Sequence, residues 1–249
     1  MNSYIALDLE TTGLEAKQEK ITEIAAIKII DGAVAGQFVT LVNPMRRLGM
    51  HITRLTGITD EMLKDAPPIE DVIGDAVEFF GDLEKLFEFT GNRVIVGHNI
   101  MFDYSFLKHA AVNSRLEFEK EGLDTLMLCR AFMPGDMKRN LSCACSYYHI
   151  SQSAAHRAQA DAEAAHRLYQ ELLKLHSQDR PELFTSKPLI YKAKREQPAT
   201  KRQKEYLQDL VKCHRIDITV QIDDISRSEA SRMIDTIISQ YGRIPRQIS

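Results

Sequence analysis

Two carboxylates lie at the end of the first apolar run of the chain, and they constrain its fold more than any other feature. The run covers residues 5–9, and Asp8 and Glu10 close it just before a turn at Thr11-Thr12-Gly13. In an extended strand, residues i and i+2 point the same way, so the two side chains lie on one face about 7 Å apart. A divalent cation would favour this pairing, because oxygen ligands suit Mg²⁺ or Mn²⁺. Such a pair alone is more often a polar strand end, so the decision depends on the rest of the chain.

The pattern of apolar residues predicts strands first and then strands alternating with helices. Asp31-Gly32 separates two β-rich runs, and an Asp-Gly pair at such a place is a strong hairpin signal. The expected strands are 3–9, 20–30, 34–42, 93–96 and 123–126, and the expected helices are 59–64, 69–89, 101–112, 140–149 and 157–176. Residues 51–59 are polar and typical of turns. This order predicts an α/β domain with a mixed five-stranded sheet flanked by helices.

The C-terminal part of the chain differs from the rest. Residues 179–200 are polar and contain three prolines, which is typical of a linker. Two further helices are expected at 201–213 and 228–241. Two short helices bury little apolar surface, so we expect a small helical appendage that docks on the main domain or on a partner. The predicted organisation is a domain over residues 1–178, the linker, and an accessory module over residues 201–249.

The composition is that of an ordinary globular chain, with 44% hydrophobic and 27% charged residues. No apolar run approaches the ~20 residues needed to cross a membrane, and the N-terminus does not have the pattern of a secretory signal. The four cysteines form no CxxC pair and no metal-finger spacing. We therefore expect reduced thiols, a cytoplasmic location and no membrane partner.

Charge is unevenly distributed along the chain. Residues 187–249 contain 13 Lys+Arg and 8 Asp+Glu, a net of +5, whereas residues 1–186 contain the other 19 and 27, a net of −8. An acidic domain can act on an anionic substrate if bound cations screen its carboxylates. The basic C-terminal part could contact a phosphate backbone, although a solvated surface is the simpler explanation of so modest an excess.

Two later stretches carry the residue types that the first two carboxylates would need. Within residues 98–107, Asp103 falls in the first turn of a predicted helix, where the helix dipole favours a carboxylate. Further on, His156 precedes a helix and Asp161 lies inside its first turns. An imidazole beside a metal-binding carboxylate is suited to take a proton from a bound water. Each stretch alone has a structural explanation, namely a helix start or a surface histidine.

Three motifs in order carry a family resemblance. They are D-x-E-T-T-G at residues 8–13, H-N-x-x-F-D-x-x-F-L at 98–107 and H-x-x-x-x-D at 156–161. Together they resemble the DEDDh 3′–5′ exonuclease superfamily, the DnaQ-like or RNase T group, and the resemblance implies a ribonuclease-H-like fold over residues 3–176. Residues 55–63 particularly resemble the epsilon-like proofreading exonucleases of bacterial DNA polymerase III. No motif residue departs from the pattern, which indicates an active member.

The resemblance implies a metal-binding and catalytic set. Asp8 would bridge two Mg²⁺ or Mn²⁺ ions, with Glu10 and Asp161 completing the first metal site. Asp103 would support the second metal, and His156 would be the general base that deprotonates the attacking water. The implied chemistry is a two-metal displacement at a phosphodiester.

The resemblance also implies contacts to the terminal nucleotide. Thr11 and Thr12 would lie against its sugar, and Leu14 against its base. His98 and Asn99 are further candidates for lining the same groove, although Asn99 is equally well explained as a helix cap.

The implied activity is release of nucleoside 5′-monophosphates from DNA 3′ ends that are single-stranded or frayed. An RNA-trimming exonuclease with the same site is an alternative, because the two differ only in accepting a 2′-hydroxyl. A non-catalytic nucleic-acid-binding subunit of a polymerase is a second alternative, against which the complete carboxylate set argues. The C-terminal residues resemble a small helical module of DNA-processing proteins, which suggests contact with DNA or with a polymerase or repair partner. Proofreading, repair and turnover are all compatible with the sequence.

Overall fold

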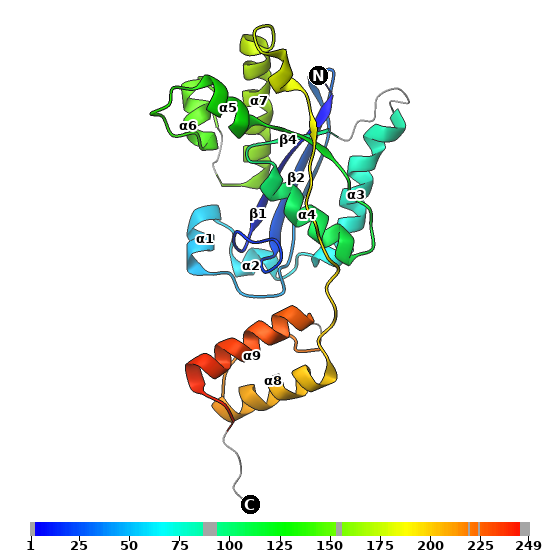
Figure 1. Ribbon diagram of the computed structural model, residues 1–249, viewed down its shortest axis with the longest axis vertical. Coiled ribbons are helices and arrows are strands. Elements are labelled where there is room, and N and C mark those ends of the chain that lie inside the picture. Colours follow the sequence, from blue (N-terminus) through cyan, green and yellow to red (C-terminus); the bar gives the residue numbers. More distant parts are fainter. Residues whose placement is uncertain (1–2, 87–93, 153–155, 219, 224, 245–249) are drawn as a thin grey trace, which may run out of the picture. The chain divides into compact units, whose positions relative to one another are not determined.

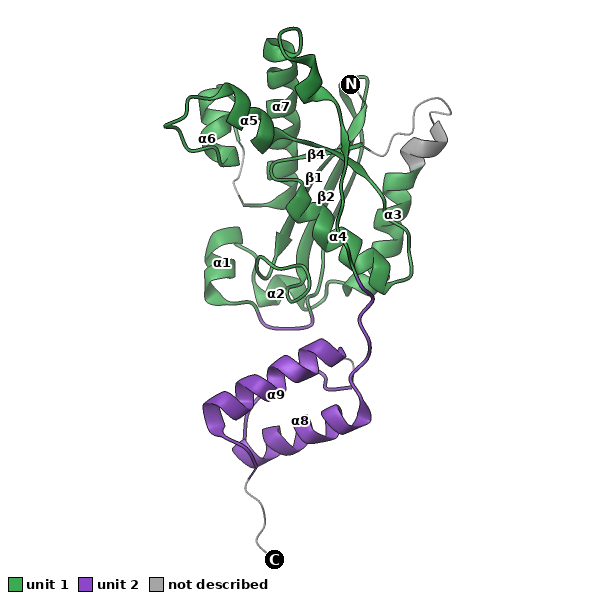
Figure 2. Ribbon diagram, in the orientation of Figure 1, with its two compact units in different colours: residues 1–44, 48–193 green, residues 45–47, 194–249 purple. Residues whose placement is uncertain are grey.

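The structure is a computed structural model that describes residues 3–86, 94–152, 156–218, 220–223 and 225–244. It divides into two compact units, one made of Met1–Pro44 and Leu48–Ala193 and the other of Met45–Arg47 and Lys194–Ser249 (Figure 2). The first unit contains the sheet and the second contains the last two helices (Figure 1). Each unit has its own core and is described by itself.

The larger unit is built on a six-stranded mixed sheet in the order β3-β2-β1-β4-β5-β6. The strands are β1 (Tyr4–Thr11), β2 (Ile21–Ile30), β3 (Ala33–Leu41), β4 (Val94–Gly97), β5 (Glu121–Asp124) and β6 (Lys187–Pro188). The pairs β1–β2, β2–β3 and β5–β6 are antiparallel, whereas β1–β4 and β4–β5 are parallel. The predicted mixed α/β sheet is confirmed, but the expected count of five strands is wrong. The sixth strand lies in the stretch expected to be a linker, at the sheet edge where a proline is tolerated.

The helices of the larger unit largely follow the predicted periodicity. They are α1 (Met50–Thr56), α2 (Asp60–Leu63), α3 (Ile69–Leu86), α4 (Met101–Asn113), α5 (Thr125–Phe132), α6 (Leu141–Tyr147) and α7 (Ala158–His176), with a 3₁₀ turn at Pro181–Phe184. Two expectations are wrong. The polar stretch expected to form turns contains α1, and the strand expected over 123–126 ends early because the Asp124 side chain accepts the Leu126 N–H and starts α5. The predicted residues 87–89 of a helix and 93 of a strand lie outside the described residues.

Alternate residues of β1 belong to two different cores. One core contains Ile5, Leu7 and Leu9 together with residues of α3 and α4, and the other contains Tyr4 and Ala6 together with residues of α5, α6 and α7. Because side chains alternate along a strand, Asp8 and Glu10 continue the series of Tyr4 and Ala6. The two carboxylates therefore lie on the face of the sheet that α7 covers (Figure 1).

The smaller unit is a pair of helices, α8 (Lys201–His214) and α9 (Arg227–Tyr241). Thr200 and Gln203 form a reciprocal capping box at the start of α8, and the Ser226 side chain caps α9. Leu207 and Leu210 of α8 are buried against Ile237 and other apolar residues of the unit. No helix in the described part of the chain is long and apolar enough to cross a membrane.

Candidate metal centre and active site

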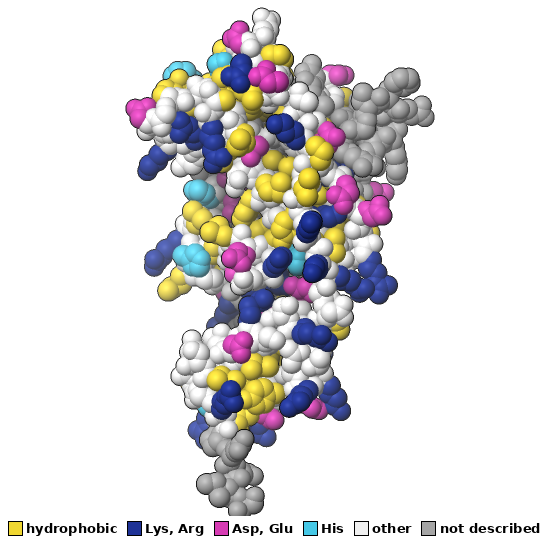
Figure 3. All heavy atoms as spheres, viewed as in Figure 1, with side chains coloured by type: hydrophobic (Ala, Val, Ile, Leu, Met, Phe, Trp, Pro, Cys, Tyr) yellow, Lys and Arg dark blue, Asp and Glu magenta, His cyan; other side chains and the backbone are white. Residues whose placement is uncertain are grey.

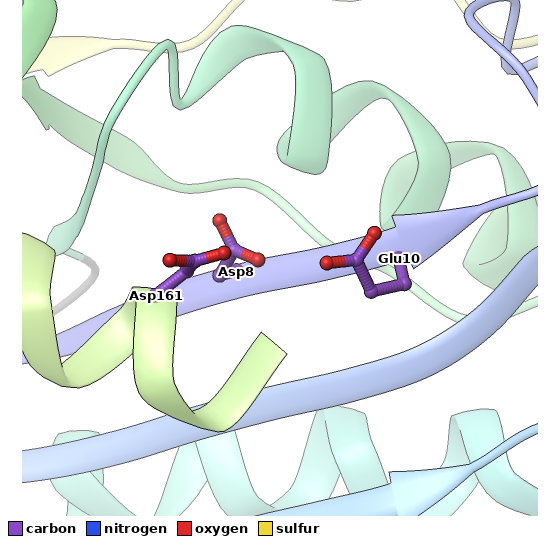
Figure 4. A group of neighbouring side chains, drawn as sticks. All are labelled: Asp8, Glu10 and Asp161. Atoms are coloured by element: carbon purple, nitrogen blue, oxygen red, sulfur yellow. The ribbon is translucent and has the colours of Figure 1, made fainter. Parts of the chain in front are cut away.

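Three carboxylates from two elements converge beside the end of β1. Asp8 and Glu10 come from β1 and Asp161 from the first turns of α7, and each offers an oxygen within 4.8 Å of the others. Figure 4 shows their carboxyl groups turned toward the same space between the strand and the helix. The donor set contains only carboxylate oxygens, which is the chemistry that Mg²⁺ and Mn²⁺ prefer. The residues present therefore fit a divalent metal site.

Asp103 reaches the same strand from α4, although it is not part of that group of three. The strand β4 pairs with β1 only at Ile5 and Ala6, so β1 extends beyond its neighbour. The backbone N–H of Leu9 donates to Oδ1 of Asp103 at 2.9 Å in this region. Only 3% of Asp103 is exposed, and its charge contributes to raising the pKa of Asp8. The fourth predicted carboxylate thus lies close enough to interact electrostatically with the cluster.

The close passage of β4 beneath this site requires a glycine. A Cβ atom on Gly97 would lie 2.9 Å from the backbone oxygen of Leu7 and 2.6 Å from Cδ1 of Ile100. A backbone oxygen cannot move aside as a flexible side chain would. Gly97 therefore allows the chain to pass β1 and enter α4, which carries Asp103.

Burial raises the pKa of all four carboxyl groups, and the charges of neighbouring carboxylates add to it. For Asp8 and Asp103 the largest cause is burial, and both pKa values lie well above the usual range. Burial and the charges of Asp161 and Glu23 raise the pKa of Glu10 to about 7. Burial also raises the pKa of Asp161. A cation placed among these groups would favour their ionised forms, so the cluster gains stability from metal binding.

The predicted general base lies at the start of α7. His156 is exposed and has a left-handed backbone, with φ of 65°. Its backbone N–H donates to Oδ2 of Asp161 at 2.9 Å. This bond fixes the turn before the helix to the same carboxylate that faces β1. The structure therefore links the backbone of His156 to the acidic cluster.

The residues predicted to contact the nucleotide sugar use their hydroxyl groups within their own loop. Thr11 Oγ1 donates to the backbone oxygen of Gly13 at 2.6 Å, and Thr12 Oγ1 donates to Glu19 while accepting from the Lys20 N–H at 2.9 Å. These bonds hold the turn after β1 in shape. Leu14, in contrast, is 85% exposed, so its side chain is open to a ligand.

His98 and Asn99 lie at the end of β4 and differ in their contacts. Both ring nitrogens of His98 are occupied, one by Thr125 Oγ1 at 2.9 Å and the other by the Arg139 backbone oxygen at 2.7 Å. Asn99 is exposed and left-handed, with φ of 71°. The alternative that Asn99 caps the helix is wrong, because Ile100 occupies the N-cap of α4 without a side-chain cap bond. These contacts favour a structural role for His98 and leave the Asn99 side chain accessible.

Sequence reasoning missed the charged residues that surround the site. Glu23 on β2 is 2% exposed and binds Arg157, the residue after His156. Asp124 accepts the backbone N–H of Asn99 and so connects the ends of β4 and β5. A carboxylate within a mostly apolar strand was the available signal for Glu23, because a buried charge requires a partner.

Comparison with known proteins identifies the family. The model of the exonuclease family RNase_T matches residues 5–169, which include all three motifs. The chain belongs to this exonuclease family. It is also 39% identical over 175 residues to the PolC-type DNA polymerase III of Bacillus subtilis, and 36% identical over 163 residues to that of Clostridium perfringens. These matches cover 69% and 66% of this chain but only 11% of each polymerase. The predicted family is confirmed.

Solved structures of exonucleases share the fold. Exonuclease X in complex with 5′ overhanging duplex DNA is 26% identical, with a TM-score of 0.53, and the match covers 70% of this chain and 93% of that one. E. coli Exonuclease I in complex with a dT13 oligonucleotide has a TM-score of 0.60 at 20% identity, over 74% of this chain and 43% of that one. The likeness to Exonuclease I shows the fold, while Exonuclease X agrees with the family in sequence as well. The expected enzyme class, an exonuclease, is thereby confirmed.

Proposed function

We propose that this chain is a metal-dependent 3′–5′ exonuclease that releases nucleoside 5′-monophosphates from DNA ends that are single-stranded or frayed. The observation that carries the proposal is the convergence of Asp8, Glu10 and Asp161, with Asp103 beside them, in surroundings that disfavour their charge. A purely binding protein gains nothing from four carboxylates that repel phosphate. The PolC-type relatives are DNA polymerases, which favours DNA as the substrate.

The four carboxylates would hold two divalent cations. When bound, the cations would stabilise negative charge on the phosphate and lower the pKa of a water molecule. His156 would accept the proton of the attacking water, as an imidazole does near neutral pH. Leu14 would pack on the terminal base, and the Thr11–Thr12 turn would present its backbone to the sugar.

Surface charge supports a site that depends on its cations. Lys and Arg side chains are scattered among acidic and polar ones on the face drawn in Figure 3. Residues 1–186 carry a net charge of −8, so the larger unit as a whole repels a phosphate backbone. Bound Mg²⁺ or Mn²⁺ would provide positive charge where the scissile phosphate has to lie.

Incubation with end-labelled oligonucleotides tests the activity and its substrate together. Single-stranded DNA, blunt duplex DNA and single-stranded RNA are each supplied with Mg²⁺, Mn²⁺ or EDTA. We expect stepwise shortening of 5′-labelled single-stranded DNA with either metal, slower shortening of the duplex, and none in EDTA. Faster shortening of RNA would replace the DNA assignment by the exoribonuclease alternative. Intact substrates under every condition would refute the proposal.

We propose further that the smaller unit contributes to binding rather than to chemistry. A truncation of the chain should end after Ala193, because β6 pairs with β5 and so belongs to the larger unit. Removal of residues 194–249 is expected to raise KM for DNA severalfold and to leave kcat within about twofold, since it takes away uniform binding. Steady-state kinetics on single-stranded DNA measure both constants. A loss of kcat larger than the rise in KM would place catalytic contributions in this unit.

A further inference from the structure

Glu23 lies directly opposite Glu10 in the antiparallel pair of β1 and β2. Directly opposed residues of an antiparallel pair point to the same face, so Glu23 faces α7 as the acidic cluster does. Both of its oxygens are already bound within the protein. Oε1 accepts from Nη2 of Arg157 at 2.7 Å, and Oε2 accepts from Nε of Arg157 at 3.1 Å and from the Ala158 N–H at 3.0 Å. Glu23 is therefore next to the cluster, with both oxygens engaged in bonds within the protein.

These three bonds fix the first turn of α7. Arg157 is the N-cap of this helix and makes no side-chain cap bond of its own. The first N–H groups of a helix need a partner, and the positive end of the helix dipole favours a carboxylate. The Glu23 side chain is the partner of the Ala158 N–H and also places a carboxylate at the positive end of the helix. It does so from a strand that is 134 residues away from Arg157 in sequence. A two-pronged guanidinium–carboxylate contact adds a defined direction to this attachment.

The anchored turn carries two predicted site residues. His156 directly precedes Arg157, and Asp161 follows within the first turns of α7. The His156 N–H donates to Asp161 at 2.9 Å, so the segment from 156 to 161 is tied to itself as well as to β2. A shift of this segment would move the Asp161 carboxylate relative to Asp8. Because Mg²⁺ requires ligand distances close to 2.0–2.1 Å, a small displacement would weaken its binding.

We infer that Glu23 and Arg157 are positioning residues, and that their ion pair sets the place of Asp161 and His156 against the carboxylates of β1. This inference rests on the proposed function, since it assumes that the carboxylates hold divalent cations. Residues that orient metal ligands from outside typically change metal affinity by 10–100-fold when they are substituted. Disruption of either partner is therefore expected to weaken metal binding by about 10–100-fold.

Glu23 and Arg157 carry opposite charges, so substitutions of the two residues distinguish a positioning role from a purely electrostatic effect on metal affinity. Glu23→Gln removes a negative charge near the cluster, and Arg157→Gln removes a positive one. If the pair acted only through its charges, the first substitution would weaken metal binding and the second would strengthen it. If the pair acts by positioning, both substitutions weaken metal binding.

The test is a direct titration of the full-length, metal-stripped protein with Mn²⁺, in which free Mn²⁺ is measured by electron paramagnetic resonance. The wild type, Glu23→Gln, Arg157→Gln and Arg157→Lys are compared, because lysine keeps the charge but not the two-pronged contact. Glu163→Gln is the matched control. It removes a carboxylate from the next turn of the same helix, where Glu163 pairs with Arg167 at 3.1 Å and accepts from Gln159 at 3.4 Å but, in the described part of the chain, makes no hydrogen bond or ion pair with Glu23 or Arg157. Circular dichroism without metal checks that each variant is folded. If Arg157→Gln does not fold, Arg157→Lys replaces it in the test, because it keeps the charge and loses only the two-pronged contact.

We expect Glu23→Gln, Arg157→Gln and Arg157→Lys each to raise the Mn²⁺ dissociation constant about 10–100-fold, with Glu163→Gln unchanged. In steady-state assays the loss should be reduced by raising the metal concentration. Mn²⁺ binding by Arg157→Gln that is as tight as in the wild type, or tighter, would overturn the positioning role alone. Absence of Mn²⁺ binding in the wild type would instead refute the proposed function. The two failures are thus distinguishable.

Discussion

Glu10 and Glu23 lie opposite each other on adjacent strands, on the same face of the sheet, yet the protein treats their charges differently. Glu23 has a guanidinium and a backbone N–H bound to its carboxylate. Glu10 faces Asp161, and burial together with the charges of Asp161 and Glu23 raises its pKa to about 7. The charge of Glu23 is thus compensated within the protein by Arg157, whereas the carboxylates of the neighbouring cluster face one another.

This difference teaches which carboxylates serve the fold and which serve a ligand. A buried charge is costly unless it is paired, so Glu23 with Arg157 is a self-sufficient structural contact. The ionised forms of Asp8, Glu10 and Asp161 are unfavourable in the absence of a bound cation. Substitution of the Glu23–Arg157 pair and substitution of a cluster carboxylate should therefore have different consequences for stability and for activity.

The largest expected effect is the loss of activity when Asp8, a proposed metal ligand, is replaced. Asp8→Asn removes one carboxylate from the cluster while keeping its size, so it should lower kcat at least about 10⁴-fold, equivalent to about 5.5 kcal/mol of transition-state stabilisation. Single-turnover assays on 5′-labelled single-stranded DNA with Mg²⁺ measure the loss. A variant within tenfold of the wild type would show that Asp8 does not hold the metal.

A smaller effect is expected for the proposed general base. His156→Ala should slow turnover by about 10²–10⁴-fold, the usual contribution of a positioned base, and should leave Mn²⁺ affinity nearly unchanged. Titration of the same variant with Mn²⁺ gives a second readout, because a base that contacts only the attacking water leaves the metal ligands in place. Mn²⁺ binding that is weakened as much as turnover would assign His156 to the structure of the α7 start instead.

The motifs predict which residues meet but not how they are held. The carboxylates on β1 follow from strand alternation, and the face they share with α7 follows from it as well. The contact of Asp103 with the Leu9 N–H could not be predicted, because it depends on where β4 stops pairing with β1. The partner of Glu23 was equally hidden, since no local pattern connects residues that are 134 positions apart.

Short elements escape sequence reasoning for a different reason. The strand β6 has only two residues, one of them a proline, and α1 has only seven. Neither is long enough to show a period, and tertiary contacts decide their structure. The Thr11 and Thr12 hydroxyls teach the same lesson at the level of single atoms, because their bonds to the loop are visible only once the turn is built.

Metal-free stability should depend on pH through the cluster. Glu10 has an ordinary pKa of 4.5 and a pKa of about 7 in the fold, so its protonated form favours the folded state. That contribution is fully present below pH 4.5 and is lost as the pH rises through 7, which amounts to about 3 kcal/mol for this group. Urea unfolding at pH 5, 6.5 and 8 measures it in EDTA and again in Mg²⁺. The decline should occur in EDTA and be reduced by Mg²⁺, and an equal decline in both would mean that the cluster does not bind the ion.

The smallest expected effect also gives the most direct contrast between a carboxylate of the cluster and Glu23. At pH 8 in EDTA, Asp8→Asn should raise the free energy of unfolding, because it removes a charge that burial and repulsion disfavour. Glu23→Gln should lower it by about 1–3 kcal/mol, because it breaks a hydrogen-bonded ion pair. Urea titrations of both variants, with Glu163→Gln as the control for an exposed pair, measure the two changes. Changes of opposite sign would show that the charge of Asp8 destabilises the metal-free fold, whereas Glu23 stabilises it. Destabilisation by both substitutions would mean that Asp8 is a structural residue like Glu23.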